Sequence, residues 1–194
     1  MSMALAGRGM RVFFPRLAAT SIQYGRGSST VCGRRRFATL LRMLNKAVFI
    51  ERCSSLHQPG WLDLRVALWS DATADEHRGY MAICLAQPER FLQLMMYDEH
   101  RRPIGFIEGS IRSDYVNGTE TSPVGFVEGV YVTPAMRRQG VARRLYAAIG
   151  DWAKARGCRE LASDALLDNE SSQRAHQALG FQETERVVYF TKKL

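Results

Sequence analysis

The stretch VYVTPAMRRQGVARRLYAAIGDWA, residues 130–153, joins a strand pattern to a helix pattern and decides the fold class. Val130 and Val132 alternate with Tyr131 as in a half-buried strand, and a proline follows two residues later. After Gly140, apolar residues recur on one face at helical spacing: Val141, Leu145, Ala148, Ile149 and Trp152. The loop between the two patterns therefore lies at a helix N-terminus, where unpaired N–H groups and the helix dipole favour an anion.

Residues Arg137–Ala142, with the sequence RRQGVA, are the candidate anion loop. The small residues Gly140 and Ala142 let the backbone approach a phosphate closely. The spacing differs from GxxxxGK[ST] and from GxGxxG, and a generic strand-to-helix turn is the alternative interpretation. Arg137 and Arg138 precede the helix and are expected to face the anion, whereas Arg143 and Arg144 lie one turn inside it and are expected on its solvated surface.

The net charge of +8 is not spread evenly along the 194 residues. Residues 1–46 contain nine basic residues and no acidic one, so this segment carries +9 and the remainder carries −1. Nucleic-acid affinity comes largely from neutralised phosphates, and a near-neutral body does not favour it. We therefore expect no nucleic-acid partner for the folded part of the chain.

Residues 1–45 are interpreted as a basic N-terminal extension and residues 46–194 as a single domain. The extension is rich in Arg, Gly and Ser and has no sustained apolar period. It fits a mitochondrial-type presequence, a disordered basic tail, or a leader without function that precedes a natural start near Met43. It contains no uninterrupted apolar segment of the secretory kind, and no apolar run in the chain approaches the length of a membrane span, about 18 residues.

The remaining pattern predicts an α+β fold with a mixed, mostly antiparallel sheet flanked by helices. Strands are expected at 47–51, 90–98, 103–115, 125–133, 158–166 and 181–193, and helices at 59–69, 73–87, 140–156 and 170–179. Strand 125–133, helix 140–156 and strand 158–166 form one βαβ unit, which should cross right-handed. The four cysteines show no CxxC spacing, which indicates reduced thiols in a cytoplasmic protein and neither a metal site nor a disulfide framework.

Several motifs together resemble one enzyme family. Arg137–Ala142 after Val130–Val132 resembles the pyrophosphate loop of the GCN5-related N-acetyltransferases (GNAT), and ASD at 162–164, Asn169 and HQALGF at 176–181 follow in the family's order. The stretches SIRSDYVNGTETSPVGFVEGVYV, GCRELASD and HQALGFQETERVVYF are similar, more narrowly, to aminoglycoside 6′-N-acetyltransferases, which modify kanamycin and tobramycin. The resemblance covers about residues 46–194 and implies the GNAT acyl-CoA N-acyltransferase fold.

The resemblance implies direct acetyl transfer from acetyl-CoA to the 6′-amine of an aminoglycoside antibiotic, conferring resistance, with no metal and in a protein that is often a homodimer. It assigns catalytic roles to Glu128, as base for the amine, and to His176, as acid for the leaving thiolate. It assigns substrate contacts to Trp69, Tyr115, Glu128, Asp164 and Glu185. It assigns cofactor contacts to Val130, Tyr131, Val132, Arg137, Arg138, Gln139, Gly140, Val141, Ala142 and Asn169.

Each polar candidate also has a structural interpretation. Glu128 would be costly to bury unpaired within GFVEGVYV, but it could lie on an exposed strand face. Asp164 could cap a loop, Glu185 could be a solvated strand residue, and His176 could be a structural helix residue. Two positions depart from the family: His176 stands where many members have Tyr, and Ser70-Asp71-Ala72 follow Trp69 where the aminoglycoside branch can place a His.

Two alternative functions remain open at this point. Acids beside an amine site also suit an acetyltransferase for polyamines or protein amines. A non-catalytic protein that senses coenzyme A, or that binds nucleic acid through residues 1–46, belongs to a different class. An acceptor panel separates the two enzymes, and nucleic-acid affinity that collapses with salt identifies the binding protein.

Overall fold

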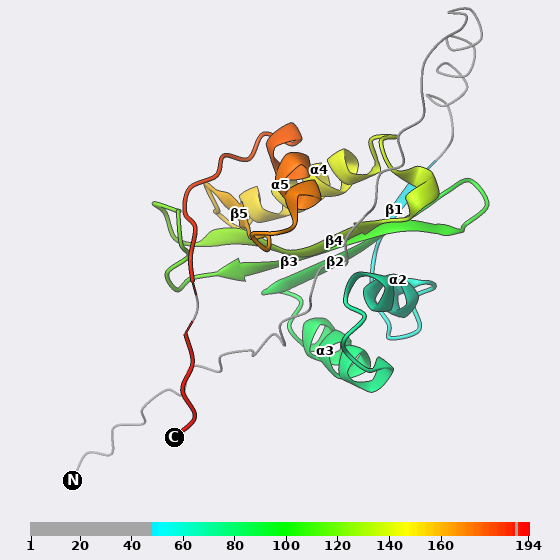
Figure 1. The fold of residues 1–194 in the computed structure, drawn as a ribbon. Coiled ribbons are helices and arrows are strands. Elements are labelled where there is room, and N and C mark those ends of the chain that lie inside the picture. The colour runs from blue at the N-terminus through cyan, green and yellow to red at the C-terminus, as the bar shows by residue number, and fades with distance from the viewer. Residues whose placement is uncertain (1–47, 189) are drawn as a thin grey trace, which may run out of the picture.

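The protein, described here from a computed structural model, is built on one five-stranded sheet in the order β1-β2-β3-β4-β5 (Figure 1). The structure describes residues 48–188 and 190–194. The strands are β1 (Phe49–Arg52), β2 (Phe91–Tyr97), β3 (Pro103–Arg112), β4 (Val124–Val132) and β5 (Leu161–Ser163). Strands β1 to β4 pair antiparallel and β5 pairs parallel to β4, which confirms the predicted mixed sheet.

Helices cover both faces of the sheet (Figure 1). They are α2 (Trp61–Leu68), α3 (Ala74–Ala86), α4 (Val141–Lys154) and α5 (Glu170–Ala178), with a short 3-10 helix, η1 (Pro134–Met136), before α4. Helices α2 and α3 lie on one face, and α4 and α5 on the other. The β4–α4–β5 segment is the predicted βαβ unit, and it sets the candidate anion loop at the end of β4.

Alternation along the strands divides the buried apolar residues between the two faces of the sheet, and a smaller cluster contains Val116, Val124 and Phe126. The core on the α4 face contains Leu92, Leu94, Met96, Ile104, Ile107, Val127, Val141, Leu145, Tyr146 and Ile149. The core on the α2 face contains Cys53, Trp61, Leu64, Met81, Met95, Tyr97 and Phe106. Helix α4 buries the predicted apolar stripe in the first core, since Val141, Leu145 and Ile149 are all buried. The helical period alone was therefore sufficient to orient α4.

Local signals also fix the start of α3. Thr73 accepts a hydrogen bond from the backbone N–H of Glu76, and the Glu76 carboxylate accepts one from the Thr73 N–H, which is a complete capping box. The predicted N-cap is confirmed. Hydrogen bonds from Thr73 lower the pKa of the Glu76 carboxyl, so this cap is ionised near neutral pH.

The predicted closing strand at 181–193 is wrong. Residues 181–188 and 190–194 form no strand in the structure, and the predicted strand at 158–166 shrinks to the three residues of β5. A strand requires a neighbouring edge, and three residues offer a short one. Val187, Val188 and Phe190 remain exposed, so the alternating pattern of this segment does not lead to pairing with the sheet.

The expectations for residues 1–45, and for Cys32, lie outside the described residues. Cys53, Cys84 and Cys158 are free and buried. Within the part of the chain that the structure describes, no helix combines the length and the apolar character that a membrane crossing requires.

Candidate functional site

A β-bulge in β4 aims the Glu128 side chain at the α2 and α3 face. Glu108 of β3 pairs with Gly129 and Gly109 pairs with Val127, so Glu128 is the extra residue between them. Such an insertion leaves the residue outside the regular ladder and redirects its side chain, and bulges are over-represented beside active sites. The acid in the middle of an apolar strand is therefore explained by the backbone.

The Glu128 carboxylate is nearly buried but paired. Ser110 Oγ donates a hydrogen bond to Oε1, and Arg112 Nη2 donates to Oε1 and Oε2 at 3.0 and 2.9 Å. Burial raises the pKa of Glu128, while Arg112 and Ser110 oppose that rise and the negative charge of Asp164 adds to it. The group is a carboxylate whose proton affinity exceeds that of a solvated glutamate, as a general base for an ammonium group requires.

Trp69 packs directly against this bulge. A Cβ on Gly129 would run into the Trp69 ring, so only glycine allows the indole to approach the strand this closely. Trp69 also meets Phe106 edge to face, with ring centroids 6.1 Å apart. The histidine expected after Trp69 is absent from the sequence there, but His77 of α3 donates from Nε2 to the Trp69 carbonyl at 3.1 Å. The indole thus forms a fixed wall beside Glu128.

The other predicted substrate residues divide into two groups. Asp164 directly follows β5 and is exposed, and its charge acts on Glu128, so the structure brings these two acids near each other. Glu185 instead accepts a hydrogen bond from Asn117 Nδ2 at 3.0 Å, which ties the C-terminal segment to the loop that begins beyond Tyr115. Tyr115 itself is exposed. The structure therefore places Asp164 near Glu128, whereas Glu185 joins the C-terminal segment to the loop after Tyr115.

The second half of β4 has one open edge. The pairs of β4 with β5 are Gly125 to Leu161, Phe126 to Ala162 and Val127 to Ser163, so the two strands diverge after Val127. On the other edge, the Thr133 N–H donates to the Ile104 carbonyl at 3.0 Å. Since backbone groups alternate in direction along a strand, Val132 and Val130 turn their N–H and C=O groups to the open edge, and Tyr131 turns its groups to β3.

The candidate anion loop contains two residues with a left-handed backbone. Gly140 at φ 80° and Arg138 at φ 60° are both left-handed, and Gly140 precedes the first residue of α4. Gln139 Nε2 donates to the Ala135 carbonyl at 2.8 Å, and Arg137 Nε donates to the Val132 carbonyl at 3.2 Å. These bonds fold the loop back on the end of β4. Because the first helical bond runs from Arg144 N to Gly140 O, the preceding N–H groups of α4 are outside the helix ladder.

Asn169 caps α5. Its side-chain oxygen accepts hydrogen bonds from the Ser172 N–H at 3.1 Å and from Ser171 Oγ at 2.9 Å. The cap explains why an asparagine stands at this point of the chain without reference to any ligand.

His176 is held by its own helix and by α4. Its Nδ1 donates to the Ser172 carbonyl at 2.8 Å, which leaves Nε2 as the acceptor for the Tyr146 hydroxyl at 3.2 Å. Phe181 meets both rings edge to face. Burial raises the pKa of Tyr146, so its proton stays on the hydroxyl and available to His176. The predicted acid is therefore one half of a hydrogen-bonded pair that the sequence did not reveal.

Comparison with known proteins identifies the family to which this arrangement belongs. The sequence model of the acetyltransferase (GNAT) family matches residues 50–181, which include all of the sheet except Phe49, together with the bulge and the anion loop. The chain belongs to the GNAT acetyltransferase family. The aminoglycoside N(6′)-acetyltransferase type 1 of Acinetobacter haemolyticus is 52% identical over 145 residues, which are 75% of this chain and 98% of that protein. The protein of the same name from Serratia marcescens is 46% identical over 73% of this chain and 97% of its own length.

Solved structures agree with this assignment. The aminoglycoside 6′-N-acetyltransferase AAC(6′)-Ih from Acinetobacter baumannii is 47% identical, with a TM-score of 0.72 over 76% of this acetyltransferase and 99% of that chain. AAC(6′)-Iy, solved in complex with the bisubstrate analogue CoA-S-monomethyl-acetylneamine, is 40% identical, with the same TM-score and the same two shares.

The acetyltransferase also contains a second buried carboxylate that sequence reasoning missed. Glu108 accepts hydrogen bonds from Trp61 Nε1 at 2.7 Å and from Arg65 Nη1. The Arg65 guanidinium lies between the rings of Trp69 and Tyr80, 4.6 and 4.8 Å from their centroids. The signal was present in the polar alternation of Glu108, Ser110 and Arg112 along β3, which indicates that this row faces one side.

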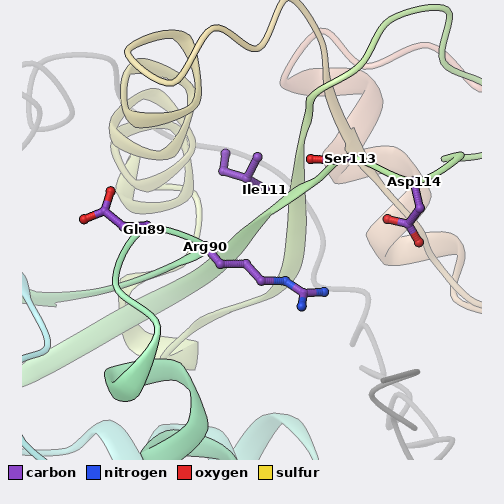
Figure 2. Close-up of a pocket in the computed structure, with 5 residues that line it drawn as sticks. All are labelled: Glu89, Arg90, Ile111, Ser113 and Asp114. Carbon is purple, nitrogen blue, oxygen red and sulfur yellow. The ribbon is translucent and has the colours of Figure 1, made fainter. Parts of the chain in front are cut away.

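A hollow of about 460 Å³ opens at the end of β3 (Figure 2). Its lining includes Ile111 and Ser113, which alternate with Arg112 and so face the α4 side of the sheet. Glu89, which also lines it, accepts a hydrogen bond at its carbonyl from Arg156 just beyond α4. The hollow is therefore on the opposite side of the sheet from Glu128.

Proposed function

We propose that this acetyltransferase transfers the acetyl group of acetyl-CoA to the 6′-amine of aminoglycoside antibiotics. The observation that carries the proposal is a nearly buried carboxylate, Glu128, set by a bulge beside the open edge of β4. The relatives of 42–52% identity bear the name of this activity. Resistance to aminoglycosides follows, because an acetylated 6′-nitrogen is no longer a cation.

The cofactor contacts are proposed from the open edge and the loop. The pantetheine arm adds to β4 as an extra strand would, through the outward backbone groups of Val130 and Val132, where an N–H can polarise the thioester carbonyl. The N–H groups of residues 138–142 hold the pyrophosphate, with charge from Arg137 or Arg138. The side chain of Tyr131 packs instead on the α2 core. Asn169 lies at the start of α5 and is proposed to contact the pantetheine.

The acceptor side is proposed to work through Glu128. An amine attacks only when neutral, so Glu128, directly or through water, takes the proton from the 6′-ammonium, and Trp69 positions the sugar against the bulge. Asp164, Glu185 and Tyr115 complete a negative and aromatic rim that attracts a polycation. On the leaving side, His176 with its partner Tyr146 is proposed to deliver a proton to the thiolate.

Transfer is proposed to be direct, in a ternary complex. A relay through an acetyl-cysteine requires a thiolate, and burial raises the pKa of Cys84 to about 12 and also raises that of Cys53 and Cys158. These three thiols are therefore protonated at neutral pH. The amine attacks the thioester carbon, and the thiolate leaves with a proton as free coenzyme A.

A homodimer in the cytoplasm, without a nucleic-acid partner, completes the proposal. The exposed apolar side chains of the C-terminal segment, Val187, Val188, Phe190 and Leu194, support a second copy as their cover. Free cysteines fit a reducing compartment, and the charge of −1 outside residues 1–46 gives little attraction to phosphates. The domain is proposed to comprise residues 46–194, with residues 1–45 as an extension.

An acceptor panel with acetyl-CoA tests the function. Thiol release is measured with kanamycin and tobramycin, with spermidine, and with a lysine peptide. We expect release with the two aminoglycosides at rates far above the other amines. Release with spermidine or the peptide alone would replace the proposed substrate class, and no release with any acceptor would overturn the enzymatic proposal.

A further inference from the structure

Arg112 covers the outer side of the Glu128 carboxylate. Two residues bond to this carboxylate from β3, and Ser110 is fully buried while the Arg112 side chain is 28% exposed. The Glu128 side chain itself is only 6% exposed. A group that approaches the carboxylate from solvent therefore meets the guanidinium first.

The guanidinium has a resting place that does not depend on Glu128. Its central carbon lies 3.3 Å from the centroid of the Phe126 ring, and Phe126 is a buried residue of β4. A cation over an aromatic face is attracted to it. Arg112 is also the last residue of β3, where the chain leaves the ladder. The side chain can thus move off the carboxylate and remain on the ring.

Beside Ser110 and Arg112, the carboxylate keeps only about one acceptor position for an ammonium group, on Oε2. A carboxylate offers about four lone-pair positions. Ser110 and Arg112 use both positions of Oε1, and Arg112 uses one of Oε2. An ammonium group, which has three donors and must come from the exposed side, competes with the guanidinium for the same oxygens.

We propose that Arg112 is the internal counter-ion of Glu128 and that a cationic acceptor displaces its guanidinium from the carboxylate. This inference rests on the proposed acceptor site. One cation replaces another, so the nearly buried carboxylate is never left unpaired, and a neutral ligand gains nothing by displacing Arg112. Arg112 is therefore a specificity-determining residue, because the strength of its pair with Glu128 sets how strongly an ammonium must bind.

The charged and titratable groups around Glu128 determine how removal of Arg112 changes the pKa of its carboxyl. Arg112 is on β3, Asp164 follows β5, and Tyr80 and Cys84 on α3 also interact with Glu128. Burial raises the pKa of Glu128, Asp164 raises it further, and Arg112 is the cation that lowers it. Without Arg112 the carboxylate should take up its proton at a higher pH than in the wild-type protein.

Calorimetric titration of kanamycin into the full chain tests the displacement. At pH 8.5, we expect Arg112→Gln to bind kanamycin about 2- to 10-fold more tightly than wild type. Arg112→Lys, which keeps the charge but loses the planar fork, should fall between them. Arg90→Gln removes a more exposed arginine, which rests on Phe91, and it should bind as wild type does. Unchanged or weaker binding by a folded Arg112→Gln protein overturns the displacement, and if that variant does not fold, the same result with Arg112→Lys overturns it.

A carboxyl titration separates this inference from the proposed function. ¹³C NMR of the Glu128 carboxyl should show a higher pKa in Arg112→Gln than in wild type and no change in Arg90→Gln. An unchanged pKa overturns the counter-ion role, whatever the acceptor is. If wild type binds kanamycin without acetylating it, the proposed function fails while both tests of Arg112 still stand.

Discussion

Glu108 and Glu128 belong to the two strands of one β-bulge, Glu108 to β3 and Glu128 to β4. They show how two similar buried carboxylates differ. Each is paired with an arginine, and the Glu108 and Glu128 side chains are only 2% and 6% exposed. Their partners differ: Arg65 is 5% exposed and stacked between two rings, whereas Arg112 is 28% exposed at the end of its strand. In our proposal, the exposure of the partner, and not that of the acid, separates the carboxylate that holds the fold from the one that a substrate reaches.

The first test of this comparison replaces the reachable acid. Glu128→Gln keeps the shape of the side chain but cannot accept a proton, so we expect turnover of kanamycin to fall about 10²- to 10⁴-fold. Steady-state thiol release measures it, and Glu99→Gln in the β2–β3 turn is the control that should keep wild-type turnover. A Glu128→Gln enzyme at the wild-type rate would remove Glu128 from the chemistry.

The second test breaks the sealed pair. Arg65→Met leaves the Glu108 carboxylate buried without its cation, and we expect the free energy of unfolding to fall by about 3–5 kcal/mol. Urea denaturation measures this change. The matched variant Arg174→Met breaks the exposed pair with Glu170 and should cost no more than about 1 kcal/mol. Equal losses in the two variants would contradict the structural role of the sealed pair.

The third test displaces the Trp69 ring from the β-bulge. Gly129→Ala places a methyl group against the Trp69 ring, and we expect a loss of about 1–3 kcal/mol in stability together with a higher KM for kanamycin. Gly150→Ala on α4 is the matched change, because a Cβ there meets no atom within 4 Å and should stabilise the helix by about 0.5–1 kcal/mol. An unchanged KM in Gly129→Ala would mean that Trp69 does not line the acceptor site.

The fourth and smallest effect concerns a carboxylate remote from the bulge. Burial opposes ionisation of Asp98, but hydrogen bonds from Arg102 and His100 outweigh it and lower its pKa from 3.8 to about 2. Stability from this group is therefore complete above pH 3.8 and is lost as the pH falls toward 2. Thermal melting of Asp98→Asn should show a deficit at pH 6 that narrows as the pH approaches 2. A deficit that stays constant with pH would exclude the charge as its cause.

The sequence was sufficient to predict the parts of the fold that depend on local patterns. Residues 130–153 implied the apolar period of α4 and the strand-to-helix loop before it, and Glu128 stood out as an acid within an apolar strand. The bulge could not be predicted, because it depends on how Glu108 and Gly129 pair across two strands. Register is a property of the assembled sheet.

The missed residues were missed for a related reason. Arg65, Glu108 and Arg112 carry charges that, read singly, suit solvent, and only their pairing makes burial tolerable. Tyr146, the partner of the predicted His176, lies 30 residues before it in the sequence and on another helix. The expected strand at 181–193 was wrong for the converse reason. Its alternation is visible in the local sequence, but a strand also needs a neighbouring strand edge to pair with, and the local sequence does not show one.

The position of the acetyl group on the product tests the central claim most directly. Kanamycin is incubated with the enzyme and acetyl-CoA, and the product is analysed by mass spectrometry and by NMR. The account predicts one added acetyl group, on the 6′-nitrogen, in an amount equal to the thiol released. An acetyl group on another nitrogen, or thiol release without acetylated kanamycin, would contradict it.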